Sequence, residues 1–287
     1  MIAPAGPVTP DELDPGIRAL EAFGLEVVPG AHLYDIHGYT AGDDRARAAD
    51  LDAMFSRPDI QAVFCARGGY GCLRLLPRID MESIRANPKI LMGYSDVTSL
   101  LWALYAETGL VSFHGPVVKG FTEQGGQDLA RFFSWLRDPV RPPEIDLSDT
   151  CRELYGGRAS GPVFGGNLSL VSHLVGTRFM PDLTGAILFL EETREPLYRI
   201  DRMLTHLTLS GELAHLSGFL AGWFGEKGTD MEVEGLLREF FEPLGIPVLA
   251  GFPVGHGPVN TPVPIGLSAT LDTDRMRLTW HESCFVQ

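Results

Sequence analysis

Ser95 is the residue of this 287-residue chain whose surroundings best fit a catalytic nucleophile. An apolar strand is predicted at 89–92, and a helix is predicted over 96–107, directly after the serine. A sharp strand-to-helix turn would expose the Ser95 hydroxyl and point the Asp96 backbone N–H, at the positive end of the helix, toward an oxyanion. The alternative is an ordinary helix N-cap, because Val97 stands where the usual elbow pattern has its second glycine.

A glycine-rich turn at 67–71 is the second candidate for binding an oxyanion. Glycines there would let a backbone N–H approach a substrate oxygen, which makes Gly69 a candidate donor, although they are also typical of turns with positive φ. The turn does not match a dinucleotide fingerprint, since Arg74 occupies the third glycine position, and the chain has no Gly-Lys-Ser/Thr loop. Nucleotide binding is therefore not predicted.

Glu191 and His256 are the candidate acid and base. Glu191 directly follows a predicted apolar strand at 186–190, and His256 lies in a glycine- and proline-rich loop. A histidine in such a loop suits general base catalysis, because its pKa lies near neutral pH. Taken alone, each also fits a plainer role, a solvated acid at a strand end and a hydrogen-bonded loop histidine. The histidines show no His-x-x-x-His or His-Glu-x-x-His spacing, so we predict no metal site.

These residues need a framework, and the first part of the chain, 1–140, reads as alternating strands and helices. This alternation predicts a mostly parallel sheet flanked by helices. The expected strands and helices, in chain order, are Met1–Ala3, Asp11–Phe23, Leu25–Val28, Asp43–Phe55, Ala62–Cys65, Lys89–Met92 and Asp96–Glu107.

The stretch 141–157 is rich in prolines and acids and shows no period, so we interpret it as a linker between two domains. The second domain, 158–287, is expected to be mixed α/β with an antiparallel end. Its expected elements are Leu168–Val175, Ala186–Leu190, Arg199–Thr208, Leu216–Phe224, Met231–Phe241, Ile265–Leu271 and Met276–Trp280.

Composition limits the possible partners. Lys and Arg number 23 against 37 Asp and Glu, a formal net charge of −14 that argues against nucleic-acid binding and against docking on anionic lipid. Four cysteines without a Cys-x-x-Cys pair fit a reducing compartment. We see no secretory leader and no run of about 18 apolar residues, so the expected location is the cytoplasm.

Eight segments together resemble the LD-carboxypeptidase family of serine peptidases, which includes murein tetrapeptide carboxypeptidases and microcin-immunity peptidases. They occur in the family's order and span nearly the whole chain. The segments are Ile2-Ala-Pro-Ala-Gly, Ala66-Arg-Gly-Gly-Tyr-Gly, Met92-Gly-Tyr-Ser-Asp-Val-Thr-Ser, Phe113-His-Gly-Pro, Gly165-Gly-Asn-Leu-Ser, Leu188-Phe-Leu-Glu-Glu, Tyr198-Arg-Ile-Asp-Arg-Met-Leu and Gly255-His-Gly-Pro with Pro264-Ile-Gly.

The resemblance implies a catalytic triad of Ser95, Glu191 and His256, with the backbone N–H groups of Gly69 and Asp96 binding the oxyanion. It also implies a Rossmann-like first domain, a mixed α/β second domain and an active site in the cleft between them. No metal or other cofactor is needed for such chemistry. The implied reaction is release of the terminal D-Ala from cytoplasmic muropeptide tetrapeptides during cell-wall recycling.

Two alternatives to this reading remain open. The same fold could hydrolyse a microcin-like peptide–nucleotide or another acyl-amino-acid conjugate, or the chain could be a peptide-binding module without catalysis. We further expect Arg67 to hold the substrate's terminal carboxylate, unless it pairs with a local acid as a structural residue, and we consider His114 a secondary substrate-binding candidate. The resemblance also implies a homodimer.

Overall fold

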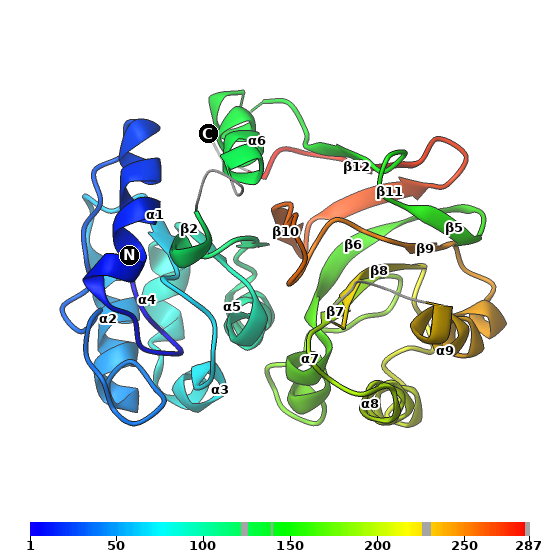
Figure 1. Cartoon of the computed structure of the whole chain (residues 1–287), viewed down its shortest axis with the longest axis horizontal. Coiled ribbons are helices and arrows are strands. Elements are labelled where there is room, and N and C mark those ends of the chain that lie inside the picture. Colours follow the sequence, from blue (N-terminus) through cyan, green and yellow to red (C-terminus); the bar gives the residue numbers. More distant parts are fainter. Residues whose placement is uncertain (122–125, 139, 226–230, 285–287) are drawn as a thin grey trace.

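The computed structural model describes residues 1–121, 126–138, 140–225 and 231–284. The first half of the chain forms one lobe and the second half another, side by side (Figure 1). The helices are α1 (Pro10–Ala22), α2 (Asp44–Ser56), α3 (Cys72–Leu75), α4 (Met81–Ala86), α5 (Thr98–Thr108), α6 (Gly126–Arg137), α7 (Leu168–Leu174), α8 (Leu197–Leu209) and α9 (Met231–Phe241), with short 3₁₀ turns η1 (Leu76–Arg78), η2 (Ser95–Val97), η3 (Val118–Gly120) and η4 (Glu242–Leu244).

The strands form two sheets, of order β1-β2-β3-β10 and β4-β12-β11-β6-β7-β8-β9-β5. Their bounds are β1 (Ala62–Phe64), β2 (Ile90–Gly93), β3 (Ser112–His114), β4 (Glu144–Asp146), β5 (Arg152–Tyr155), β6 (Arg158–Asn167), β7 (Ile187–Glu192), β8 (Gly218–Phe224), β9 (Val248–Ala250), β10 (Val263–Ile265), β11 (Ser268–Asp272) and β12 (Arg277–Trp280).

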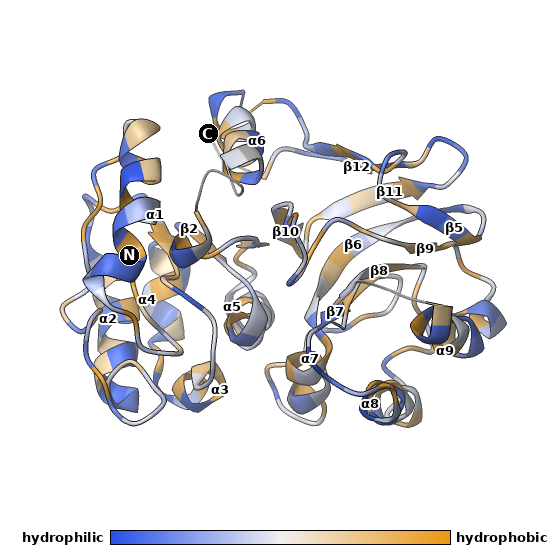
Figure 2. Ribbon diagram, in the orientation of Figure 1, coloured by the Kyte–Doolittle hydropathy of each residue, from blue (hydrophilic) through white to orange (hydrophobic). Residues whose placement is uncertain are grey.

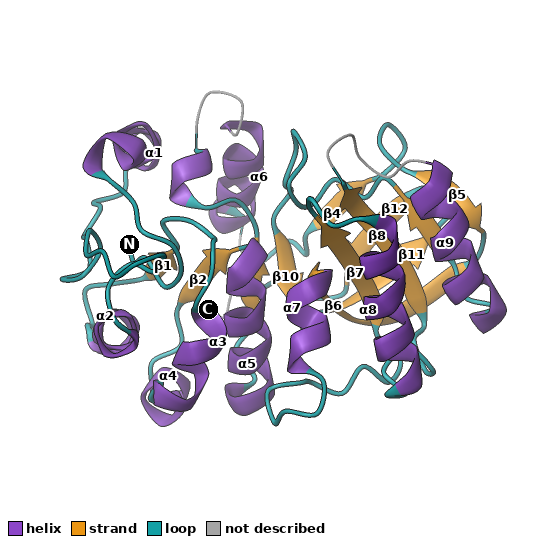
Figure 3. Ribbon diagram, turned by 60° about the horizontal axis from the view of Figure 1, so that its bottom comes forward, coloured by secondary structure: helices purple, strands orange, loops and turns teal. Residues whose placement is uncertain are grey.

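The first sheet is parallel except at one edge. Strands β1, β2 and β3 run parallel, whereas β10, from the C-terminal half, pairs antiparallel with β3. Helices lie on both sides of this sheet, with α1 and α6 on one side and α2, α4 and α5 on the other (Figure 3). Strand β2 is apolar from Ile90 to Met92 and buried from Leu91 onward, as a central strand should be. The helices around this sheet, for example α1 and α2, carry many hydrophilic residues (Figure 2). This first sheet carries the serine at the carboxyl end of β2.

The second sheet has a parallel core, β6-β7-β8-β9, and antiparallel strands at both ends. Helices α7, α8 and α9 lie along one face of it (Figures 1 and 3). The mostly parallel first sheet and the mixed second sheet confirm the expected α/β fold class.

Helix α5 joins the two halves. The buried Trp102 indole N–H donates a 2.8 Å hydrogen bond to the Gly165 carbonyl of β6, and the Asn167 N–H donates to Thr98 Oγ1 at 3.1 Å. Gly166, at φ 140°, lies so close to Thr98 that a Cβ there would come within 2.5 Å of its side chain. Gly166 of β6 therefore gives α5 room to pack against that strand.

Four expected elements differ from the structure. The expected strand Ile265–Leu271 is divided, since Ile265 ends β10 in the first sheet and β11 begins at Ser268 in the second. The stretch 25–28 forms no strand, and its pairing with the first segment is limited to two hydrogen bonds, from the Met1 amino group to the Val28 carbonyl and from the Gly30 N–H to the Met1 carbonyl. The predicted first strand reduces to a single parallel bridge between Ile2 and Cys65. The expected linker 141–157 is not merely a connection, since β4 and β5 within it pair with β12 and β9 of the second sheet.

No helix within the described ranges is long and apolar enough to cross a lipid bilayer.

The bond between α5 and β6 predicts a stability difference between two buried tryptophans. Trp102→Phe leaves the Gly165 carbonyl unpaired, whereas Trp280→Phe removes an indole N–H that has no hydrogen-bond partner among the described residues. We expect Trp102→Phe to cost about 1–2 kcal/mol more than Trp280→Phe in urea unfolding. Equal losses would show that the Trp102 bond contributes nothing beyond packing.

Candidate active site

Ser95 is the first residue of η2, at a sharp turn after β2, and lies in the left-handed backbone region at φ 63°. Such a conformation is strained for a serine and is the mark of a nucleophile elbow. Gly93 makes the turn possible, because a Cβ there would lie 2.8 Å from the Val97 side chain. This geometry agrees with the expected strand-to-helix turn at the serine, except that a 3₁₀ turn precedes α5.

The glycine-rich turn 67–71 packs directly against this elbow. The buried Asp96 carboxylate accepts a 2.8 Å hydrogen bond from the Cys72 N–H, which ties the end of that turn to the elbow. Burial raises the pKa of Asp96, and the Cys72 hydrogen bonds only partly oppose that shift. Gly69 has φ 130°, and the Asp96 N–H lies in the first helical turn, where backbone N–H groups lack intrahelical acceptors. The structure thus places both predicted oxyanion donors in segments that flank Ser95.

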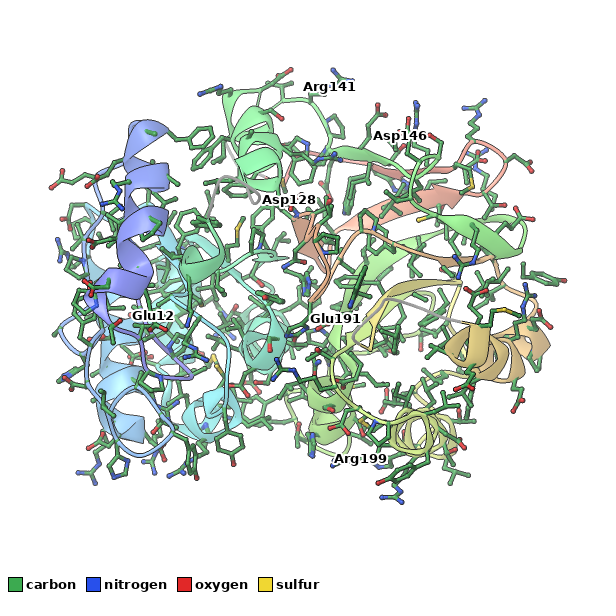
Figure 4. The ribbon with its side chains drawn as sticks, in the orientation of Figure 1. Glu12, Asp128, Arg141, Asp146, Glu191 and Arg199 are labelled. Carbon is green, nitrogen blue, oxygen red and sulfur yellow. The ribbon has the colours of Figure 1, made fainter. Side chains whose placement is uncertain are left out.

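Glu191 is fully buried near the carboxyl end of β7, opposite Asn167 of β6. Figure 4 shows it between the two halves of the molecule. Every residue of β7 is buried, so the consecutive side chains Glu191 and Glu192 are both buried, and the pairing of β7 with β8 shifts register between Leu190 and Glu192. Glu191 Oε2 lies 2.7 Å from His256 Nδ1, while Glu191 Oε1 has no hydrogen-bond partner among the described residues.

Glu192 has a different role from its neighbour, one that sequence reasoning did not identify. Its carboxylate accepts hydrogen bonds from the Asn167 amide at 3.0 Å, the Ser169 hydroxyl at 2.7 Å and the Ser169 N–H at 2.9 Å. Burial raises the pKa of Glu192, and these bonds counteract that shift in part. A carboxylate on the first turn of α7 also suits the helix dipole. Glu192 therefore fixes the strand end that carries Glu191.

His256 links the other two residues of the expected triad. Its Nε2 lies 3.2 Å from Ser95 Oγ, and its Nδ1 faces Glu191. A carboxylate only accepts, so Nδ1 carries a proton and Nε2 is left to accept one from the serine. The Tyr94 ring packs against the imidazole at 5.0 Å between centroids, and 22% of the histidine side chain is exposed. The structure thus brings together the three residues that the sequence selected.

The pKa of His256 is raised above that of an ordinary histidine. Burial pulls this pKa down, but the hydrogen bond to Glu191 and the negative charges of Glu191 and Glu192 together outweigh burial, and Arg194 opposes them weakly. A raised pKa makes the imidazole a stronger base for the Ser95 proton and stabilises the imidazolium that results.

The two predicted substrate-binding residues have different outcomes. Arg67 donates a 3.0 Å hydrogen bond from its guanidinium to the Pro7 carbonyl, so it has a structural partner, and its binding of a carboxylate stays a prediction. The prediction that His114 binds substrate is wrong. It is 0% exposed and lies 3.2 Å from Asn260 Oδ1, so it offers no surface for a substrate to contact. Sequence reasoning missed this because the short strand β3 gives no signal that both of its sides are covered.

A serine on a strained elbow, within hydrogen-bond reach of a histidine that an acid orients, is the arrangement used by serine hydrolases. The fold and site place the chain in that class. Comparison with known sequences then identifies the family. The profile of the LD-carboxypeptidase N-terminal domain matches residues 1–115, and that of the C-terminal domain matches residues 160–271. The chain belongs to the LD-carboxypeptidase family and is a serine-type carboxypeptidase, which confirms the resemblance seen in its motifs.

Curated relatives cover nearly the whole chain. A probable murein peptide carboxypeptidase of Bacillus subtilis is 39% identical over 283 residues, 95% of this chain and 88% of that protein. The murein tetrapeptide carboxypeptidase of Pseudomonas aeruginosa is 34% identical, covering 96% of this chain and 94% of its own length. The microcin C7 self-immunity protein MccF of Escherichia coli is 29% identical, with 98% and 91% covered.

Solved structures show the same fold. Microcin C7 self-immunity protein MccF in its inactive mutant apo state superposes with a TM-score of 0.91 at 26% identity, covering 99% of this chain and 96% of that one. Muramoyltetrapeptide carboxypeptidase from Oxalobacter formigenes gives a TM-score of 0.84 at 29% identity, covering 97% and 96%.

The contact between Gly68 and Ser95 predicts the effect of one added methyl group. A Cβ at position 68 would lie 2.9 Å from Ser95 Cβ and 3.1 Å from Ser95 Oγ, so Gly68→Ala must displace the serine. We expect kcat to fall on the order of 100-fold, the usual cost of misplacing a reacting atom by about 1 Å. Gly120→Ala is the matched control, because a Cβ there meets nothing within 4 Å. Wild-type kcat in Gly68→Ala would contradict the elbow geometry.

The raised pKa of His256 predicts the pH profile. As the expected base, His256 acts when neutral, so we expect kcat/KM to fall as pH drops through its pKa, with an acidic midpoint above about 6.5, the ordinary histidine value. Glu191→Gln removes the negative charge that raises the pKa of His256, so burial of the imidazole lowers that pKa with less opposition. The midpoint should therefore move down, and kcat should fall on the order of 10³–10⁴-fold. Steady-state rates between pH 5 and 9 measure both, and an unmoved midpoint would remove Glu191 from this role.

Proposed function

We propose that this enzyme is an LD-carboxypeptidase that releases the terminal D-Ala from muropeptide tetrapeptides. The observation that carries the proposal is the chain of contacts from Glu191 through His256 to Ser95, at 2.7 and 3.2 Å. It supplies a nucleophile, a base and an orienting acid from this chain's own side chains, so the proposed reaction is independent of metal.

In the first half of the proposed reaction, His256 Nε2 takes the Ser95 proton while Oγ attacks the amide carbonyl. Glu191 holds the imidazole through Nδ1 and stabilises its charged form. The oxyanion that forms accepts hydrogen bonds from the Gly69 and Asp96 N–H groups, each contributing about 3 kcal/mol to lowering the barrier. The imidazolium then gives its proton to the leaving amine, and D-Ala departs.

In the second half, water replaces the amine. His256 Nε2 removes a proton from that water as its oxygen attacks the acyl ester on Ser95. The same backbone donors hold the second oxyanion, and the proton returned to Ser95 Oγ releases the shortened peptide. His256 thus acts in turn as base, acid, base and acid, which its contacts to both Ser95 and Glu191 allow.

The substrate class is supported by the relatives. Those at 39% and 34% identity are named for murein peptide and murein tetrapeptide carboxypeptidase activity. The proposal places the reaction in the cytoplasm, where recycled muropeptides are processed. We also propose that Arg67 contributes to holding the substrate's terminal carboxylate. We further propose that the enzyme is a homodimer, and a measurement of its molar mass in solution tests this.

A second substrate class is favoured by one specific observation. A structure of MccF in complex with glutamyl sulfamoyl guanosine superposes with a TM-score of 0.90 at 26% identity, over 99% of this chain. The same Ser95 chemistry would cleave the acyl bond of such an aminoacyl–nucleotide conjugate. This alternative requires a nucleotide-accepting cleft and retains every step assigned to the triad.

D-Ala release is the direct test. The purified enzyme is incubated with a muropeptide tetrapeptide, and the products are followed by mass spectrometry with and without EDTA. We expect release of D-Ala that survives EDTA and is lost by at least about 10³-fold in Ser95→Ala. Ser134→Ala is the matched control and should keep wild-type activity, because it removes an exposed hydroxyl whose only bond among the described residues is to the Arg131 carbonyl.

Other outcomes separate the alternatives. Activity lost in EDTA would contradict metal independence. Absent D-Ala release, with Ser95 still labelled by a fluorophosphonate, would shift the assignment to the aminoacyl–nucleotide class. Release that persists in Ser95→Ala would refute the triad itself.

A further inference from the structure

A buried polar cluster lies behind the His256 loop and takes no part in the proposed chemistry. It consists of His114 on β3, Asp128 on α6 and Asn260 just before β10, which are 0%, 6% and 8% exposed. Buried polar groups carry a free-energy cost unless they are hydrogen-bonded, so a cluster of three beside an active site calls for a physical reason.

Asn260 is the centre of this cluster. Its side-chain Oδ1 accepts a 2.9 Å hydrogen bond from the Gly255 N–H and lies 3.2 Å from His114 Nε2. A backbone N–H only donates, so the atom facing Gly255 must be the amide oxygen, and His114 must in turn donate from Nε2. Burial lowers the pKa of His114 to about 4, which keeps that imidazole neutral at neutral pH. One oxygen of Asn260 therefore accepts two donors from different parts of the fold.

Asp128 anchors the other end of Asn260. Its Oδ2 accepts a 2.9 Å hydrogen bond from the Asn260 N–H, and its Oδ1 lies 3.5 Å from the Thr261 hydroxyl. Asp128 belongs to α6, above the seam where Glu191 lies (Figure 4). Asn260 is thus held through its backbone by the N-terminal half and through its side chain by both β3 and the His256 loop.

The atom that Asn260 holds is adjacent to the triad. Gly255 immediately precedes His256 and has φ 106°, and a Cβ at this position would lie 2.7 Å from Glu191 Cβ and Oε2. There is no space between this peptide and the acid of the triad. Any shift of the Gly255 peptide therefore changes the distance between His256 and Glu191.

We propose that Asn260 is a positioning residue that sets the His256 imidazole against Glu191 and Ser95 by holding the Gly255 peptide from behind. Neutral His114 is the second donor that keeps the Asn260 carboxamide oriented, and Asp128 fixes its backbone. The inference rests on the proposed function, because it concerns the same triad.

Asn260→Leu tests the proposal, since leucine has a similar size and no oxygen. We expect kcat, and the rate at which a fluorophosphonate labels Ser95, to fall at least about tenfold with KM within about twofold, because orientation of the base is lost while the substrate contacts remain. Thr273→Val is the matched control. It also removes a buried side-chain oxygen that accepts a backbone N–H, that of Gly157 at 2.9 Å, but far from the site in the turn between β11 and β12.

Rescue distinguishes positioning from mere stability. Asn260→Asp keeps an oxygen that accepts from Gly255 and His114, so its kcat should recover most of what Asn260→Leu loses. If Asn260→Leu and Thr273→Val lower the melting temperature alike and neither lowers kcat, the residue is only structural and the proposal is overturned. If Asn260→Leu does not fold, Asn260→Ser takes its place, because the serine side chain is too short for its oxygen to reach the Gly255 N–H. This variant must show the same loss of kcat, and a wild-type kcat in it overturns the proposal.

The labelling rate separates this inference from the choice of substrate. A wild-type enzyme that is labelled at Ser95 but releases no D-Ala refutes the muropeptide assignment, while a slower labelling of Asn260→Leu still supports the positioning role. A wild-type enzyme that is not labelled refutes the proposed function and this inference together.

Discussion

The close packing of α5 against β6 is the contact on which the site depends. Ser95 stands just before α5, and Glu191 lies on β7, the strand next to β6, so the distance between the proposed nucleophile and the proposed acid is set by how closely that helix approaches that strand. The approach is close because β6 has a glycine at 166, facing Thr98, and it is fixed by hydrogen bonds from Trp102 to the Gly165 carbonyl and from the Asn167 N–H to Thr98. A side chain at Gly166 would meet Thr98 and hold the halves apart, and with them the residues of the proposed triad.

The second constraint is the burial of negative charge at the end of β7. Two consecutive acids are buried there, which is favourable only if each finds donors. Glu192 receives its donors from Asn167 and Ser169, within the second half of the chain. Glu191 faces His256 instead, and its charge raises the pKa of that histidine. Glu192 thus holds the end of β7, and Glu191 is left available to bond His256.

Sequence reasoning located what depends on local pattern. The elbow at Ser95, the acid at a strand end and the loop histidine each carry a local signature, and their family order supplied the link between them. Strand β6 was missed because its glycines are typical of loops, whereas they serve close contacts: a Cβ at Gly165 would lie 2.1 Å from the Phe189 carbonyl oxygen. The burial of His114 was missed for a related reason, since it is created by Asn260 and Phe189, residues distant in sequence.

The path of the chain after β9 explains why the histidine loop needs support from both halves. The loop leaves β9 in the second sheet, carries His256 and Asn260, and ends at β10 in the first sheet, where β10 pairs with β3. A base on a segment that crosses between two lobes would follow any motion of one lobe against the other. Its peptide is therefore held at Gly255 by Asn260, which is itself bonded to Asp128 on α6 and to His114 on β3. The geometry of the proposed triad thus depends on the same contacts that hold the first and second sheets in one arrangement.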